Sequence, residues 1–224
     1  MKTITKSVFG SPGRSGMSVP ALVTLAIAAL ALVVLALSPT AAQSAERHNG
    51  NTIGLSGGKT WLKIDKGTAS ALSDAGVKVE ATGAAVGPTA ERPAFAFPIV
   101  GGKVDKGPLG GRIVHSGGLS FSANSESVVV KRFVIDVDRG VLTAKVAGTG
   151  QRIALLRLGA PDGAKVGAGR IVLRGVDAEL TAQAAKALNE ALDTDLFEGG
   201  LLVGEATVIA KYGDDHKGED RNDD

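Results

Sequence analysis

The stretch from Ser127 to Val137 constrains the fold most, because it is the longest segment with the composition of a β-strand. Side chains of a strand point alternately to its two faces, so we expect the odd-numbered residues from Val129 to Val137 on one face. Asp138-Arg139-Gly140 then predicts a turn into a second strand, Val141 to Val146. This hairpin places the chain in a β-rich class.

Further short apolar segments lie between glycine and proline turns, and these segments predict most of the remaining structure. Pro98 indicates an edge strand or a bend, and Gly101–Gly102 indicates a turn. The additional strands are expected at 60–65, 77–81, 95–99, 113–115, 119–121, 153–158, 170–176 and 205–211.

Two helices are expected among these strands. A short one covers 68–74 and ends at Gly76, and a longer one covers 180–192 with Thr181 able to cap its start. The predicted fold class is mainly β: an antiparallel β-sandwich or curled sheet with one short and one longer helix.

The N-terminal region predicts export. Lys2, Lys6 and Arg14 precede an apolar run over 21–37, and small residues follow up to Ala45. This order is typical of a secretory signal peptide, with cleavage between Ala42 and Glu46. The alternative is an uncleaved anchor on the outer face of the plasma membrane formed by residues 21–37, although seventeen helical residues span only about 25 Å. The expected location is therefore secreted or cell-surface.

The predicted domain organisation follows from this boundary. Residues 1–45 form the signal peptide, 46–54 a flexible lead-in, 55–212 the β-rich domain and 213–224 a disordered acidic tail. The chain has no cysteine, which excludes disulfides and thiolate-ligated metals. An exported domain of this kind must be held together by packing alone.

Charge argues against nucleic acid as a partner. The whole chain carries +2, of which three positive charges belong to the signal, so the mature chain is close to neutral at 2 − 3 = −1. Its basic residues are dispersed along the sequence and predict no phosphate-binding stripe.

No catalytic constellation is visible, and we expect the protein not to be an enzyme. His115 is the one histidine inside the predicted domain, and Ser116 is its neighbour. Adjacent residues of a strand point to opposite faces, so these two side chains do not form a nucleophile–base pair. A histidine hydrogen-bonded at a strand end is the simpler interpretation of His115, and a ligand-binding role is the alternative.

One series of segments resembles a known family. It comprises Phe97-Pro98-Ile99-Val100-Gly101-Gly102, then the segment from Gly111 to Phe121, then Val134-Ile135-Asp136 and Gly140-Val141-Leu142. This order resembles the HtaA domain of exported haem-uptake proteins, over about residues 55–147. The resemblance implies a β-rich exported fold and a role related to haem.

The residues that ligate haem in that family are not matched. The resemblance implies a tyrosine early in the domain and a histidine after the strand that here ends at Phe121. Ser122-Ala123-Asn124 follow Phe121, and the only tyrosine is Tyr212. His115, Ser116 and Phe121 are therefore the candidate ligand-binding residues, with haem as a possible cofactor and no metal site assigned otherwise.

The leading functional hypothesis is an exported cell-envelope binding or interaction module that resembles HtaA domains. The alternatives are a carrier of a lipid or another apolar molecule and a passive structural wall protein. Apolar side chains of 129–137 and 142–146 would line the ligand groove of such a carrier, although an ordinary sandwich core uses the same faces. A hydrolase with paired carboxylates is the least supported class, because no pair stands out.

Overall fold

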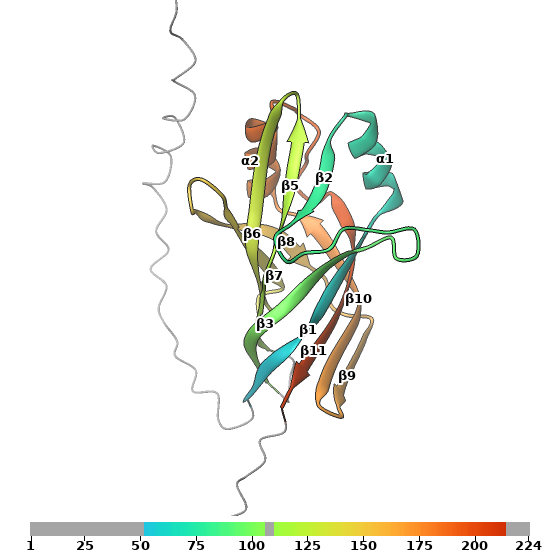
Figure 1. Cartoon of the computed structure of the whole chain (residues 1–224), viewed down its shortest axis with the longest axis vertical. Helices are drawn as coiled ribbons and strands as arrows, with labels where there is room; N and C mark the ends of the chain where they lie inside the picture. The colour runs from blue at the N-terminus through green and yellow to red at the C-terminus, as the bar shows by residue number, and fades with distance from the viewer. Residues whose placement is uncertain (1–51, 106–109, 214–224) are drawn as a thin grey trace, which may run out of the picture. The chain divides into compact units, whose positions relative to one another are not determined.

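The computed structural model describes residues 52–105 and 110–213 and shows eleven strands and two helices (Figure 1). The strands are β1 Thr52–Ile64, β2 Lys78–Thr82, β3 Phe95–Asp105, β4 Gly111–His115, β5 Gly118–Ala123, β6 Glu126–Asp136, β7 Val141–Val146, β8 Arg152–Leu158, β9 Gly163–Gly167, β10 Arg170–Leu180 and β11 Leu202–Tyr212. The helices are α1 Lys66–Asp74 and α2 Ala182–Leu192.

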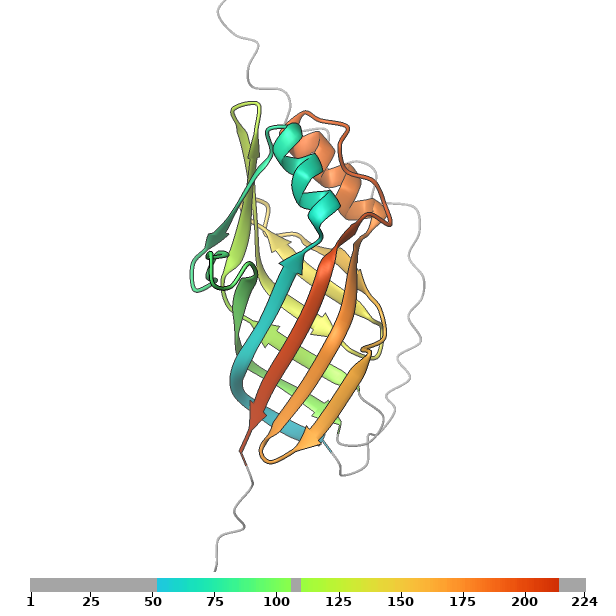
Figure 2. The same ribbon diagram turned by 90° about the vertical axis from the view of Figure 1, so that its right-hand side faces the viewer.

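Eight of the strands close into an antiparallel barrel, so the expected sandwich or curled sheet is wrong in its architecture and right in its mainly β class. Neighbouring strands follow the order β6-β4-β3-β1-β11-β10-β8-β7, and β7 pairs with β6 to complete the ring. The strands on the near and far walls cross in Figure 2, which reflects their tilt about the barrel axis.

Strand β6 is the branch point of the sheet. Its first half pairs with β5, its second half pairs with β4, and β7 runs along its other edge. A register shift between Lys131 and Val134 interrupts the β6–β7 ladder, and Arg132 has a φ of 55° there. A bulge of this kind bends a strand and re-aims its side chains.

The bulge corrects the expected alternation of β6. Val130 and Phe133 are both buried, whereas the two residues between them, Lys131 and Arg132, are exposed. The phase therefore changes at Arg132, and Val129 does not share a face with Phe133. One inserted residue moves every later side chain to the opposite face, which the sequence pattern does not reveal.

Both helices lie at the same end of the barrel (Figures 1 and 2). Asp65 caps α1 by accepting from the Thr68 amide, and Thr181 caps α2 as predicted by accepting from Ala184. Asn124, in the β5–β6 turn, donates to the carbonyl oxygen of Leu192 at the end of α2. This bond ties the helix end of the barrel to the start of β6.

Several boundaries differ from the sequence prediction. β1 begins at Thr52, so the expected lead-in over 46–54 is too long by its last three residues, and β1, not the segment 127–137, is the longest strand. β3 continues through Gly101–Gly102, where the sequence predicted a turn, and its pairing with β4 shifts register between Ile99 and Gly101. Pro98 lies next to this shift, and β3 is paired on both of its edges, so it is not the edge strand that the proline suggested.

Strand β9 was not predicted at all. Its five residues are all exposed, so the strand has no buried face, and glycine stands at both of its ends. The predicted signal peptide over 1–45 lies outside the described residues, and so does the predicted acidic tail over 213–224 except for its first residue. Within 52–105 and 110–213, no helix has the length and apolarity needed to cross a membrane.

The first prediction tests the close approach of β1 and β11. A Cβ on Gly58, which has a φ of 120°, would overlap the carbonyl oxygen of Ile209 on β11. We expect Gly58→Ala to lower the free energy of unfolding by about 2 kcal/mol or more.

Gly54→Ala is the matched control in the same strand, because its Cβ would meet no atom within 4 Å. It should change stability by less than about 0.5 kcal/mol. Urea denaturation of both variants measures the difference, and equal stability of the two would contradict the β1–β11 register.

Candidate functional site

The interior of the barrel contains a cavity of about 430 Å³, within the size range of small-molecule sites. Every strand of the closed ring contributes at least one lining side chain, and most of these are aliphatic. Those from the strands are Thr60, Leu62, Phe97, Ile113, His115, Phe133, Ile135, Leu142, Leu155, Leu156, Leu158, Leu173, Val176, Ala178, Ala206 and Val208, with Leu119 added from β5.

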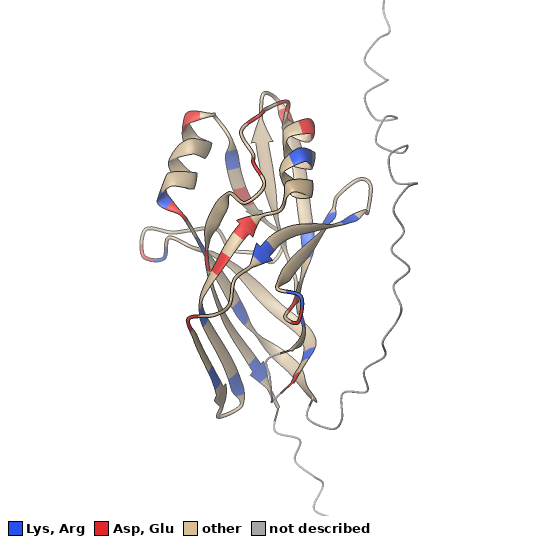
Figure 3. Cartoon of the chain, turned by 180° about the vertical axis from the view of Figure 1, so that it is seen from behind, with Lys and Arg blue, Asp and Glu red and all other residues tan. Residues whose placement is uncertain are grey.

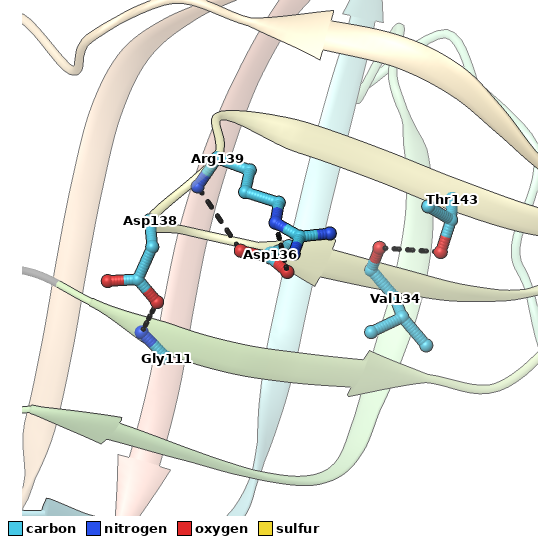
Figure 4. Close-up of polar contacts among 6 residues, drawn as sticks. All are labelled: Gly111, Val134, Asp136, Asp138, Arg139 and Thr143. Carbon is cyan, nitrogen blue, oxygen red and sulfur yellow. Dashed lines mark hydrogen bonds and ion pairs between the residues drawn. The ribbon is translucent and has the colours of Figure 1, made fainter. Parts of the chain in front are cut away.

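The cavity reaches the barrel end opposite the helices, where the turn between β6 and β7 forms part of its rim. The Asp138 carboxylate accepts from the Gly111 amide at 2.8 Å, and Asp136 accepts from the Arg139 amide at 3.2 Å (Figure 4). The Leu158 amide donates to the Gly140 carbonyl at 2.7 Å. These bonds fix the rim to β4 and β8.

The polar group at the inner part of the cavity is a buried pair from β1 and β4. Thr60 Oγ1 lies 2.7 Å from His115 Nε2, and the exposed fractions of the two residues are 6% and 3%. Gly111 lies at the rim, and His115 is at the other end of the same strand, so the pair lies deep in the barrel.

Burial decides the charge of this histidine. Desolvation lowers the pKa of His115 from 6.5 to about 4, and a backbone contact with Phe133 raises it by less. The imidazole is therefore neutral at pH 7. Nδ1 is buried and has no hydrogen-bond partner among the described residues, so the Phe133 contact does not satisfy it.

An unsatisfied buried nitrogen costs about 1–3 kcal/mol. A neutral imidazole of this kind can accept or donate one hydrogen bond or ligate a metal, depending on its tautomer. The arrangement therefore offers one polar contact inside an otherwise apolar container, which suits binding and orienting a ligand.

The three predicted site residues do not come together. His115 lines the cavity. Ser116 lies outside the barrel wall, where its amide donates to the Pro98 carbonyl. Phe121 is on β5, beyond the closed ring, and packs edge-on against Phe197 with ring centroids 6.4 Å apart.

Thr60 is the polar residue that sequence reasoning missed. It is separated from His115 by 55 positions, and only the pairing of β1 and β4 with opposite edges of β3 brings the two together. Its inward place in the alternating segment Thr60-Trp61-Leu62 was the available indication.

A serine motif in β1 does not form a catalytic site with His115. Gly54-Leu55-Ser56-Gly57-Gly58 has the spacing of a nucleophile elbow, but it lies within a strand instead of a strand–turn–helix corner. Ser56 is exposed, and His115, the one histidine among the described residues, is engaged with Thr60.

Comparison with known proteins supports the fold assignment. No protein-family model and no curated protein matches the sequence. Among solved structures, the chain is similar to the C-terminal domain of HtaA from Corynebacterium glutamicum, with a TM-score of 0.55 and 15% identity over 72% of this chain and 99% of that one.

A second solved structure, the heme binding protein HtaB from the same organism, aligns with a TM-score of 0.45 and 10% identity over 72% of this chain and 96% of that one. That superposition is too loose to support an argument. The similarity to the HtaA domain is sufficient to assign the fold. The described domain has an HtaA-domain-like fold, as the motif order predicted.

The second prediction concerns pH. Since the pKa of His115 is lower in the folded state than in the unfolded chain, the unfolded chain binds more protons between pH 6.5 and about 4. Stability should therefore fall as the pH drops through this window, by up to about 1.4 kcal/mol per pH unit from this residue.

Urea denaturation at pH 7, 6 and 5 measures this slope, with His115→Gln as the comparison, because glutamine does not titrate. The wild type should lose more stability than the variant over this range. Identical slopes would show that His115 is not buried as a neutral group.

Proposed function

We propose that this domain binds an apolar small molecule in the barrel cavity, and that haem is the first ligand to test. The observation that carries the proposal is an apolar cavity of about 430 Å³ that contains a neutral histidine, whose Nδ1 has no hydrogen-bond partner within 52–105 and 110–213. Binding is a better match than catalysis, because Thr60 and His115 are the polar pair of the inner cavity, whereas the charged lining residues Asp138 and Arg139 belong to the rim.

The residues of the cavity fit the chemical demands of haem in two respects. Haem iron accepts an imidazole ligand, and the depressed pKa keeps His115 in the neutral form that a metal requires. The aliphatic walls suit the porphyrin faces, and Arg139 at the rim offers a cation for a propionate. Bound haem would supply the iron, and this chain would supply the ligand nitrogen and exclude water.

Two further features support a haem-related role. The motif order of residues 97–142 resembles HtaA domains of haem-uptake proteins, and the fold agrees with that resemblance. The N-terminal sequence favours export, so we propose a secreted or cell-surface binding module, anchored through residues 21–37 if the signal is retained.

The third prediction is a hemin titration of the purified protein, which contains His48 and His216 as well as the barrel. Hemin should produce a Soret band that saturates at one equivalent, and His115→Ala should weaken binding by about tenfold or more through loss of the iron ligand. His48→Ala and His216→Ala are the matched controls, because both residues lie outside the described barrel.

A saturable band that is equally strong in all four proteins would exclude His115 as the ligand. No band at all would exclude haem. The apolar walls of the cavity favour a lipid or another neutral apolar molecule as the second candidate in that case. Native mass spectrometry of freshly purified protein should then show a bound, extractable molecule.

The fourth prediction concerns export. The chain produced in its own host should appear outside the cytoplasm with its N-terminus between Ala42 and Glu46. N-terminal sequencing of the secreted or surface-released protein provides the test. Full-length protein in the cytosolic fraction would contradict this proposal without affecting the ligand-binding one.

A further inference from the structure

A second concavity lies on the outer surface of the barrel, where β5 diverges from β4 along β6. It encloses about 830 Å³. We call it the basic groove, and its lining residues are Thr82, Gly83, Val100, Val114, His115, Ser116, Gly117, Val129, Lys131, Arg132, Val134, Lys145 and Arg152.

Three of its cations lie directly opposite one another on neighbouring strands. Lys131 of β6 pairs in register with Lys145 of β7, and Lys145 pairs with Arg152 of β8. Like charges in directly opposed positions destabilise a sheet. The groove lining contains no acidic residue, and none of these cations forms an ion pair with a described residue. This arrangement is unfavourable for the fold alone.

The fourth cation of the groove is Arg132, which lies at the bulge of β6. Arg132 adopts a φ of 55° inside a strand, a region that a long side chain rarely enters. The bulge at this point leaves Lys131 and Arg132 both exposed on the groove side of the wall. Residues in strained backbone conformations are enriched at functional sites.

The guanidinium of Arg152 is held in place before any ligand arrives. Nη1 donates to Thr143 Oγ1 at 2.9 Å, and Nη2 donates to the carbonyl oxygen of Arg132 at 3.1 Å. These bonds join β8 to the bulge of β6 and to β7. They place one cation of the row at a fixed position, which lowers the entropy lost when an anion binds.

The groove also has an apolar part. Val100, Val114, Val129 and Val134 contribute to its lining, and Val100 is 60% exposed. Figure 3 shows blue Lys and Arg positions on the projecting β7–β8 hairpin. The groove thus combines uncompensated positive charge with one exposed and three half-buried valines.

We propose that the basic groove binds an amphiphilic anion, meaning an aliphatic or ring body that carries a phosphate or carboxylate. The cations Lys131, Arg132, Lys145 and Arg152 contact the anionic group, and the valines contact the apolar body. This site lies outside the barrel and is additional to the cavity, because none of the four cations lines the cavity.

Isothermal titration with monomeric dodecyl phosphate tests the proposal. The wild-type domain should bind it, and added sodium chloride should weaken the binding because the cations are exposed to solvent. Inorganic phosphate and the uncharged amphiphile dodecyl maltoside should each bind at least about tenfold more weakly, since each supplies only half of the contacts.

The deciding variant is Lys145→Gln with Arg152→Gln, which should weaken dodecyl phosphate binding by about tenfold or more. Lys145→Gln alone should keep or raise the Tm, because it removes repulsion from Lys131 and Arg152 and leaves both hydrogen bonds of Arg152 intact. Lys165→Gln with Lys186→Gln is the charge-matched control, since neither residue lines the groove, and it should change the affinity less than about twofold.

Unchanged affinity in the groove variant would overturn the proposal and would place the ligand elsewhere, for example in the barrel cavity. Equal losses in the groove variant and the control would also overturn it, because they would indicate attraction by net charge alone. Lys145→Gln alone preserves both bonds made by Arg152, so it provides the same test if the double variant fails to fold.

Discussion

The pairing of β6 with strands on both of its edges is the contact on which the structure depends. Without the β6–β7 ladder, the sheet would be an open curl and its inner face would be exposed to water. With it, the inner side chains of eight strands enclose a single space. Closure also removes the free edges of the ring, leaving β2 and β9 as short terminal strands.

The bulge at Arg132 has consequences on both sides of the barrel wall. On the inner side it allows Val130 and Phe133 to be buried in succession, and Phe133 then packs edge-on against Phe97 with ring centroids 5.1 Å apart. On the outer side it exposes Lys131 and Arg132 next to the cations of the β7–β8 hairpin. The interior core and the basic groove therefore depend on the same local distortion.

Much of the secondary structure was predictable because it is encoded locally. Alternating side chains identified most of the strands, and the Thr181 cap together with apolar spacing identified α2. β9 was missed because all of its side chains are exposed, so no burial pattern exists to detect. Gly101–Gly102 was interpreted as a turn, but a glycine pair also occurs at register shifts within a strand. The sequence alone does not distinguish the two.

The site was only half predictable for a related reason. His115 stood out as the one histidine in the folded segment, and the structure places it in the cavity wall. Its partner Thr60 and the enclosing strands depend on pairings between distant segments, which periodicity does not reveal. Phe121 is the last residue of the motif segment 111–121, but it belongs to β5, which lies outside the closed ring, and its ring packs against Phe197 instead of lining the cavity.

The central claim is that a neutral His115 inside a closed barrel contacts the ligand, and side-chain nitrogen NMR of histidine-labelled protein tests it most directly. At pH 7 the His115 ring should give the resonances of a neutral imidazole, and adding zinc protoporphyrin should shift them while those of His48 and His216 stay unchanged. A ring that is protonated at pH 7, or that does not respond while the porphyrin is demonstrably bound, would contradict the account.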